Sequence, residues 1–325
     1  SLDEGKTWTK YSGNPVLPNP GIRDFRDPKV FWYEAEKKWV MTLATLDHIT
    51  FYSSPDLKNW KEESKFGKTI GAHGGVWECP DLFPLIYNGQ KHWVLIVNIN
   101  PGGPNGGSAT QYFVGNFDGK TFKPYQTDTQ WLDYGPDEYA GVTWDNTGDR
   151  RLFIGWMSNW QYANDVPTQL WRSAMTISRE LGIEKIGNKY FVTSKPVKEL
   201  NVLNGKEYKT NSVSTQQFNL SEKAGALNGP VRLNISSNQI GSFDITLSND
   251  LNEKVIIGFN AKENQYFIDR SKSGKTDFEK GFAAKHISPR FSFKNEMDLT
   301  LIIDDASVEL FADRGLTVMT SIFFP

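Results

Sequence analysis

Three acidic residues in the first half of the chain recur at regular spacing and are of the type that can donate protons or stabilise charge. Asp27, Glu78 and Asp137 each stand at or near the start of a short apolar strand, and they recur at intervals of 50 to 60 residues. Cleaving a bond between two sugars needs one carboxyl group that donates a proton and another that attacks or activates water. The three acids are therefore candidates for a sugar-cleaving site. A solvated turn or a cap is the simpler explanation for any one of them.

The neighbours of two of these acids predict different roles. Glu78 lies between a tryptophan and a Cys-Pro pair, a weakly polar setting that suits a proton donor. Asp27 follows Arg26, whose positive charge suits a carboxylate that stays ionised and whose guanidinium can bind sugar hydroxyls. A purely structural ion pair between Arg26 and Asp27 is the alternative.

The spacing also predicts a fold that brings these residues together. Each of three segments runs from an acid into an apolar strand, turns, and returns as an aromatic strand, and such a period is typical of a β-propeller. The first strand of each blade lines the central channel, so the three acids should meet at one mouth. The second strand ends where the first began, which places Asn100, Asn159 and Trp160 on the rim of the same pocket.

A short turn before an aromatic residue forms a second repeat. Residues 56–60 and 118–122 share this turn, and residues 3–8 match it at the beginning of the sequence. The match predicts that residue 1 falls near the end of a blade. About three blades should then lie within the sequence.

The strand pattern changes after residue 192. We expect residues 1–192 to form a partial propeller and residues 193–208, which are polar and include Pro196, to form a linker. Residues 209–325 contain shorter, regularly alternating strands that are typical of a β-sandwich. The predicted fold class is all-β, with a propeller followed by a supporting sandwich.

Composition argues against several other classes of protein. The formal net charge is −2 and the basic residues form no stripe, so we expect no nucleic-acid partner. No apolar run is long enough to predict a membrane span. The four histidines lack metal-ligand spacing, and the glycine-rich segment 102–107 lacks the lysine of a phosphate-binding loop. We therefore expect neither a metal nor a cofactor. Cys79, the single cysteine, has no histidine near it in sequence and is not predicted to be a nucleophile.

Two short motifs resemble those of glycoside hydrolase family 32. Phe25-Arg26-Asp27-Pro28 is similar to the family's Arg-Asp-Pro motif, and Trp77-Glu78-Cys79-Pro80 is similar to its Glu-Cys motif. Further similar stretches follow in order at residues 8–17, 100–108, 155–160, 178–181 and 308–313. The resemblance implies a five-bladed propeller followed by a sandwich. It also implies an enzyme that releases fructose from β-fructofuranosides such as levan, inulin or sucrose, with retention of configuration.

The resemblance assigns roles to the matching residues. Glu78 is expected to be the general acid and base, Asp27 to stabilise the transition state, and Arg26 to bind sugar. To these we add four residues as predicted substrate contacts: Cys79, Asn100, Asp137 and Trp160. The loop at 100–108 and the stretch 155–160 look most like exo-acting fructanases, a group with levanases and exo-inulinases. A secreted or periplasmic location follows from the resemblance as well.

One family motif has no counterpart here. The family's nucleophile is an aspartate in a Trp-Met-Asn-Asp-Pro-Asn-Gly motif near the N-terminus, and no such motif occurs in this sequence. We therefore expect two N-terminal blades to be absent, the chain alone to be inactive, and those blades to be a candidate partner. Two alternatives stay open: a fructosyltransferase of the same family, and a fructan-binding module without catalysis.

Overall fold

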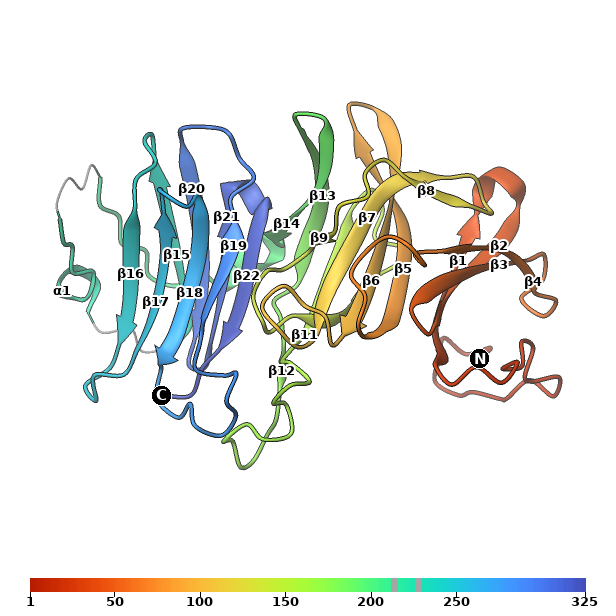
Figure 1. The fold of residues 1–325 in the computed structure, drawn as a ribbon, viewed down its shortest axis with the longest axis horizontal. Helices are drawn as coiled ribbons and strands as arrows, with labels where there is room; N and C mark the ends of the chain where they lie inside the picture. Colours follow the sequence, from red (N-terminus) through yellow and green to blue (C-terminus); the bar gives the residue numbers. More distant parts are fainter. Residues whose placement is uncertain (212–215, 226–228) are drawn as a thin grey trace.

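Strands dominate the structure, which confirms the all-β class. The structure is a computed structural model that describes residues 1–211, 216–225 and 229–325. Within these residues the only α-helix is α1 (Ser221–Ala224), and three short 3-10 segments are η1 (Glu34–Glu36), η2 (Lys198–Leu203) and η3 (Asp313–Gly315). Figure 1 shows the sheets arranged side by side along the longest axis of the molecule.

Three antiparallel sheets form the first part of the chain. The first contains β1 (Phe25–Tyr33), β2 (Lys38–Thr45), β3 (His48–Ser54) and β4 (Lys61–Phe66) in that order. The second contains β5 (Val76–Tyr87), β6 (Gln90–Asn100), β7 (Ala109–Phe117) and β8 (Phe122–Pro124), with β9 (Gln130–Trp131) paired to β7. The third contains β10 (Tyr139–Thr143), β11 (Arg151–Met157), β13 (Arg179–Ile186) and β14 (Lys189–Pro196), with β12 (Ala174–Met175) paired to β11. These sheets coincide with the three repeated segments, whereas a total of five blades stays a prediction.

The first strand of each sheet breaks register near its start. In each case two residues of the first strand face one residue of the second, which is the signature of a β-bulge. The breaks fall between Arg26 and Lys29, between Glu78 and Asp81, and between Tyr139 and Val142. Each break contains a non-glycine residue with positive φ, and these are Asp27 (57°), Cys79 (44°) and Ala140 (52°).

The repeated bulge fixes which residues are equivalent in the three sheets. Arg26, Glu78 and Tyr139 all occupy the position immediately before the residue with positive φ. The predicted alignment of Asp27 with Glu78 and Asp137 was therefore out of phase. The correct third member is Tyr139, two residues after the acid that the sequence pattern selected.

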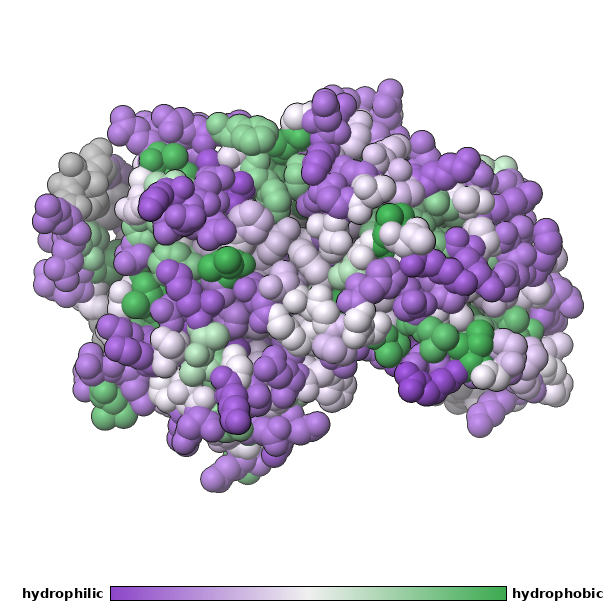
Figure 2. Space-filling view, in the orientation of Figure 1, coloured by the Kyte–Doolittle hydropathy of each residue, from purple (hydrophilic) through white to green (hydrophobic). Residues whose placement is uncertain are grey.

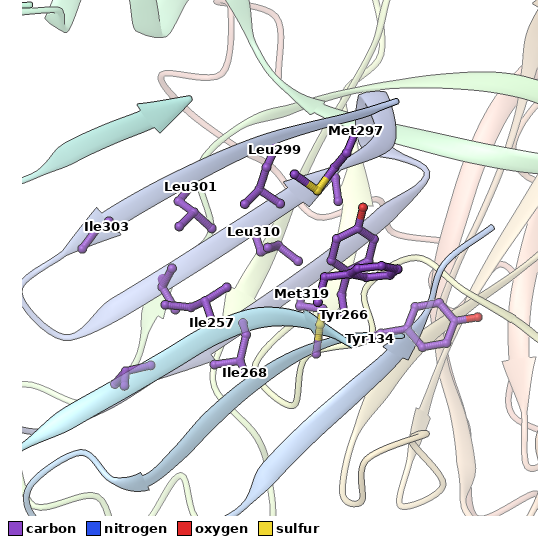
Figure 3. Packing of buried hydrophobic residues seen from close by; sticks show 14 of the residues in the cluster. Tyr134, Ile257, Tyr266, Ile268, Met297, Leu299, Leu301, Ile303, Leu310 and Met319 are labelled. Atoms are coloured by element: carbon purple, nitrogen blue, oxygen red, sulfur yellow. The ribbon is translucent and has the colours of Figure 1, made fainter. Parts of the chain in front are cut away.

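Residues 231–325 form a sandwich of two four-stranded sheets. One sheet has the order β15 (Val231–Ser237), β20 (Met297–Asp304), β21 (Ser307–Ala312) and β22 (Thr317–Ile322). The other has the order β16 (Phe243–Ser248), β17 (Lys254–Asn260), β18 (Gln265–Lys272) and β19 (Lys285–Pro289). Their facing side chains, among them Ile257, Ile268, Leu301 and Leu310, form one apolar core (Figure 3). Tyr134 joins this core from the propeller side and so ties the two parts together.

The junction between the two parts differs from the predicted linker. β14 extends to Pro196, so the first four residues assigned to the linker, 193–196, belong to the last strand of the third sheet. Their pairing with β13 explains the difference, because Thr193 to Pro196 continue the hydrogen-bonded register opposite Arg179 to Gly182. η2 then leads from β14 towards the sandwich.

The surface is polar over most of the face drawn in Figure 2, and its hydrophobic residues lie in separate patches. Within the described residues, no helix combines the length and the apolar character needed to span a membrane.

Candidate active site

Glu78 lies at the centre of a cluster that joins all three sheets. Arg26 on β1 donates to Glu78 Oε1 from Nη2 at 2.7 Å and from Nε at 3.2 Å. The Tyr139 hydroxyl on β10 donates to the other carboxylate oxygen, Oε2. Burial raises the pKa of Tyr139 well above its ordinary value, with the hydrogen bond to Glu78 adding to the shift, so this hydroxyl remains a donor. Two of the three equivalent bulge positions, Arg26 and Tyr139, therefore form hydrogen bonds to the third, Glu78.

Asp27 lies beside this cluster, held by the adjacent strand. Its Oδ2 accepts a hydrogen bond from the backbone N–H of Cys79 at 3.0 Å, and the Cys79 Sγ lies 3.7 Å from the same oxygen. The side chain of Asp27 is 31% exposed and that of Glu78 is 19% exposed. Both acids are thus held in place and can still be reached from solvent.

Arg26 pairs more closely with Glu78 and Asp24 than with its sequence neighbour Asp27. Arg26 Nε lies 4.0 Å from Asp27 Oδ2, whereas the same guanidinium makes short contacts with Glu78 and with Asp24, the latter at 2.5 Å from Nη1. Hydrogen bonds from Arg26 lower the pKa of Asp24 and hold it ionised. The Asp27 carboxylate instead accepts a hydrogen bond from the backbone N–H of Cys79.

Cys79 is a structural part of the site rather than a reactive thiol. It occupies the bulge on β5 with φ of 44°, and its thiol is directed at the Asp27 carboxylate. Burial raises the pKa of Cys79 to about 12, and the charges of Asp27 and Glu78 add to the effect. Because the nucleophilic form of cysteine is the thiolate, this shift disfavours reaction of Cys79 near neutral pH.

A tryptophan pair, Trp156 and Trp160, lies next to Tyr139 at the predicted rim. Trp156 lies opposite Tyr139 in the β10–β11 ladder, and its ring centroid is 5.0 Å from that of Trp160. Trp160 is 49% exposed, so one face of its ring is available for stacking against a sugar. Asn100 ends β6 opposite Val76 and is half-buried, close to the start of the strand that carries Glu78.

Asn159 supports this rim from beneath. It is fully buried, and its Oδ1 accepts hydrogen bonds from the backbone N–H groups of Ser108 and Gln161, at 3.2 and 2.9 Å. Its Nδ2 donates to the Pro136 carbonyl at 2.7 Å. Asn159 therefore holds the glycine-rich loop and the start of the Trp160 segment in place. The prediction that its side chain lies on the rim of the pocket is wrong, because Asn159 is fully buried.

Asp137 is not part of the mouth, contrary to the prediction. Its side chain is fully buried, where it accepts from Arg270 on β18 at 2.7 Å and from the backbone N–H of Ile322 at 2.9 Å. The Tyr162 hydroxyl also donates to it. Asp137 joins the third sheet to the sandwich, and burial among these partners leaves it no surface for a ligand.

Two residues of the site, Tyr139 and Asp24, were not predicted from the sequence. Tyr139 could have been found by aligning Ala140 with Asp27 and Cys79, but only Asp27 and Cys79 are followed by proline. Asp24 carries no signal beyond its charge. Among the described residues, no group of three or more His, Cys, Asp or Glu side chains is arranged to hold a metal ion.

Comparison with known proteins identifies the class to which this fold and site belong. Residues 1–196 match the N-terminal domain of glycosyl hydrolases family 32, and residues 197–325 match the C-terminal domain of the same family. The chain therefore belongs to glycoside hydrolase family 32.

Individual relatives are similar along the whole chain. Levanase from Bacillus subtilis is 44% identical over 338 residues, which include 100% of this chain and 50% of the levanase. An extracellular exo-inulinase from Aspergillus niger is 38% identical over 353 residues, with 100% of this chain and 65% of the relative covered. This chain therefore spans about half to two thirds of the length of these relatives.

Solved structures match as well. An exo-inulinase from Aspergillus awamori superposes with a TM-score of 0.85 at 34% identity, covering 100% of this chain and 68% of the other. A fructofuranosidase from Schwanniomyces occidentalis complexed with fructose superposes with a TM-score of 0.80 at 30% identity, covering 100% and 69%.

Proposed function

We propose that this chain carries the proton donor and the charge-stabilising carboxylate of a glycosidase that releases fructose from β-fructofuranosides. The observation that supports the proposal most directly is that two carboxylates from different sheets, Glu78 and Asp27, lie side by side and both remain partly exposed. The names of the levanase and exo-inulinase relatives support levan and inulin as substrates. Sucrose is the third candidate.

The chemistry assigned to each side chain follows from its contacts. Glu78 donates a proton to the oxygen that leaves with the rest of the substrate while the bond from that oxygen to the fructosyl carbon breaks. It then accepts a proton from the water that releases fructose. The negative charge of Asp27 stabilises the positive charge that develops on the fructosyl ring. Retention also requires a nucleophilic carboxylate, and we assign that role to none of the residues in this chain.

Two other functions use the same contacts. A fructosyltransferase differs only in passing the fructosyl group to a sugar hydroxyl instead of water. A fructan-binding module would use Arg26, Asp27 and the exposed Trp160 to hold sugar without cleaving it. The names of the relatives favour hydrolysis.

One assay separates these functions. The gene product at its full natural length is incubated with sucrose, inulin or levan, and products are followed by chromatography and by NMR of the first-formed anomer. We expect free fructose with retained configuration. Longer oligosaccharides formed from sucrose would instead establish transfer, and binding without any product would establish a binding module.

We also propose that the protein acts outside the cell, because one relative is named an extracellular exo-inulinase. Recovery of the fructose-releasing activity in the culture medium of the source organism tests this location. Activity confined to the cell pellet would contradict it.

A further inference from the structure

A second pocket, with a volume of about 170 Å³, lies where the propeller part meets the sandwich. Its walls come from the segment 158–173 that follows β11, from the turn 304–307 between β20 and β21, and from the end of β22. None of the residues around Glu78 lines it. Figure 1 shows the segment between β11 and β12 extending from the third sheet beside the sandwich.

The lining has the composition of a sugar-binding pocket. Its floor is apolar, with Met157, Val166 and Phe324 contributed by a buried cluster. Trp171 stands at the edge with 52% of its surface exposed, so its ring can cover the apolar face of a sugar. No lysine, arginine or histidine lines the pocket, which makes it a poor site for an anion.

Two neighbouring carboxylates provide the polar side. Asp304 and Asp305 both line the pocket, and within the described residues neither forms an ion pair. Asp304 accepts only from the backbone N–H of Asp305, at 2.8 Å, and the Asp305 carboxylate has no hydrogen-bond donor in the described part of the chain. Carboxylates that lack a cation are strong acceptors for neighbouring hydroxyl groups. A neutral ligand that carries several hydroxyls fits these groups.

The pocket is structurally connected to the mouth of the candidate active site. The segment that supplies Trp171 begins beside Trp160 on the rim, and it returns as β12, where Ala174 pairs with Met157 and Met175 pairs with Trp156. The same segment of the third sheet thus carries the tryptophans of the rim and, further along the chain, those residues from Trp171 to Ala174 that line the pocket.

We propose that this pocket binds one fructosyl unit of a polymeric fructan whose end is cleaved at Glu78. This inference rests on the proposed function and narrows its substrate class to polymers. The volume is below the roughly 300–1,000 Å³ typical of pockets for drug-sized ligands, so it suits a single monosaccharide unit rather than an oligosaccharide. Sucrose cannot occupy the mouth and this pocket together, because both of its units are used at the bond that is cleaved.

The test compares two substrates on the protein at its full natural length. Trp171→Ala removes the stacking surface, and Asp305→Asn removes one carboxylate without changing its shape. We expect each variant to lower kcat/KM for high-molecular-weight levan or inulin by about three- to tenfold and to leave kcat/KM for sucrose unchanged. Trp144→Ala, which removes a tryptophan that is 43% exposed and does not line the pocket, is the matched control.

Each other result has a defined meaning. If the wild type and both variants have the same kcat/KM for the polymer, the pocket does not bind a fructosyl unit. The proposed function is unaffected by that result. An equal loss on polymer and on sucrose also overturns it, because the segment then only supports the Trp160 rim. If the wild type releases no fructose from any substrate, the proposed function fails. In that case an NMR titration with inulin-type oligosaccharide decides, since identical binding by wild type and Trp171→Ala rejects the pocket.

Discussion

Two arginine–carboxylate pairs in this protein have the same shortest distance and different surroundings. Arg26 Nη2 lies 2.7 Å from Glu78 Oε1, and Arg270 Nη1 lies 2.7 Å from Asp137 Oδ2. The side chain of Arg26 is 39% exposed, whereas both side chains of the Arg270 pair are 0% exposed. Distance therefore does not distinguish these two pairs, whereas accessibility does.

The remaining partners extend the contrast. Arg270 also donates to the carbonyls of Phe282 and Ile322, at 2.7 and 3.1 Å, and to the Tyr162 hydroxyl, so its hydrogen-bonding capacity is used within the protein. Its guanidinium carbon lies 3.8 Å from the centre of the Phe282 ring. The Arg26 cluster faces solvent and can exchange one partner for a ligand. Mutations in the Arg26 cluster should consequently change activity, whereas mutations in the Arg270 cluster should change the free energy of unfolding.

The largest effect is expected for Glu78→Gln. The amide cannot donate a proton to the leaving oxygen, so kcat on a fructan should fall by about 10²- to 10⁴-fold. The melting temperature should stay close to that of the wild type, because the pair with Arg26 is partly exposed and the amide keeps a hydrogen-bond acceptor. Steady-state kinetics and calorimetry on the protein at its full natural length measure both quantities. Glu62→Gln, at an exposed carboxyl, is the control, and near-normal turnover of Glu78→Gln would remove Glu78 from the role of acid.

Arg270→Met should have the opposite profile. It leaves Asp137 buried without its cation, and breaking a buried pair in this way costs about 3–5 kcal/mol of unfolding free energy. Urea denaturation measures that loss. Arg314→Met, at an arginine whose side chain is 46% exposed and 3.5 Å from Glu184, should cost less than about 1 kcal/mol. Equal losses in the two variants would show that burial does not distinguish these pairs.

The contrast also explains how far the sequence could be interpreted. The period of apolar strands located the three sheets, and Arg26, Asp27 and Glu78 do lie together. The phase of the third repeat could not be read, because a bulge adds one residue without leaving a consistent residue type behind. Asp137 was chosen because it is the acidic residue that opens the third repeated segment, and its real partner, Arg270, lies 133 residues away in the sandwich. Such a long-range pair leaves no local signal in a single sequence.

A third carboxyl is buried like that of Asp137, but within the described residues it forms no ion pair. Glu138 immediately precedes Tyr139 and is only 1% exposed, packed where a side chain on Gly155 would overlap its carboxylate. Burial raises the pKa of Glu138 to about 8, and the charge of Asp133 contributes in the same direction. Because the unfolded chain has the ordinary pKa of 4.5, the neutral carboxyl stabilises the fold fully below about pH 4.5, and this contribution is lost as pH rises through 8.

We therefore expect Glu138→Gln to change the pH dependence of stability. Between pH 4.5 and 8 the wild type should lose stability relative to the variant by up to about 1.4 kcal/mol per pH unit. Urea denaturation at a series of pH values measures the difference. Glu263→Gln, at an exposed carboxyl, should run parallel to the wild type. Parallel curves for Glu138→Gln as well would show that Glu138 ionises normally in the fold.

The last expected effect concerns Cys79, which adjoins Glu78 in the accessible cluster yet behaves like a buried group. Its pKa of about 12, against an ordinary value of 9.0, lowers the thiolate fraction at pH 8 by about 10³-fold, so alkylation by iodoacetamide should be slower by about that factor than in the urea-unfolded chain. Cys79 is the only cysteine, so the mass shift after alkylation reports on it alone.

Asp27→Asn removes one of the two negative charges that raise the pKa of Cys79 and should accelerate alkylation. The acceleration should be smaller than that caused by unfolding, because burial is the larger cause of the raised pKa. Asp24→Asn tests the specificity of that effect, since Asp24 contacts Arg26 and not the thiol. Alkylation of the folded protein at the unfolded rate would show that solvent reaches Cys79. Every residue around Glu78 would then be accessible, in contrast to the buried residues around Arg270.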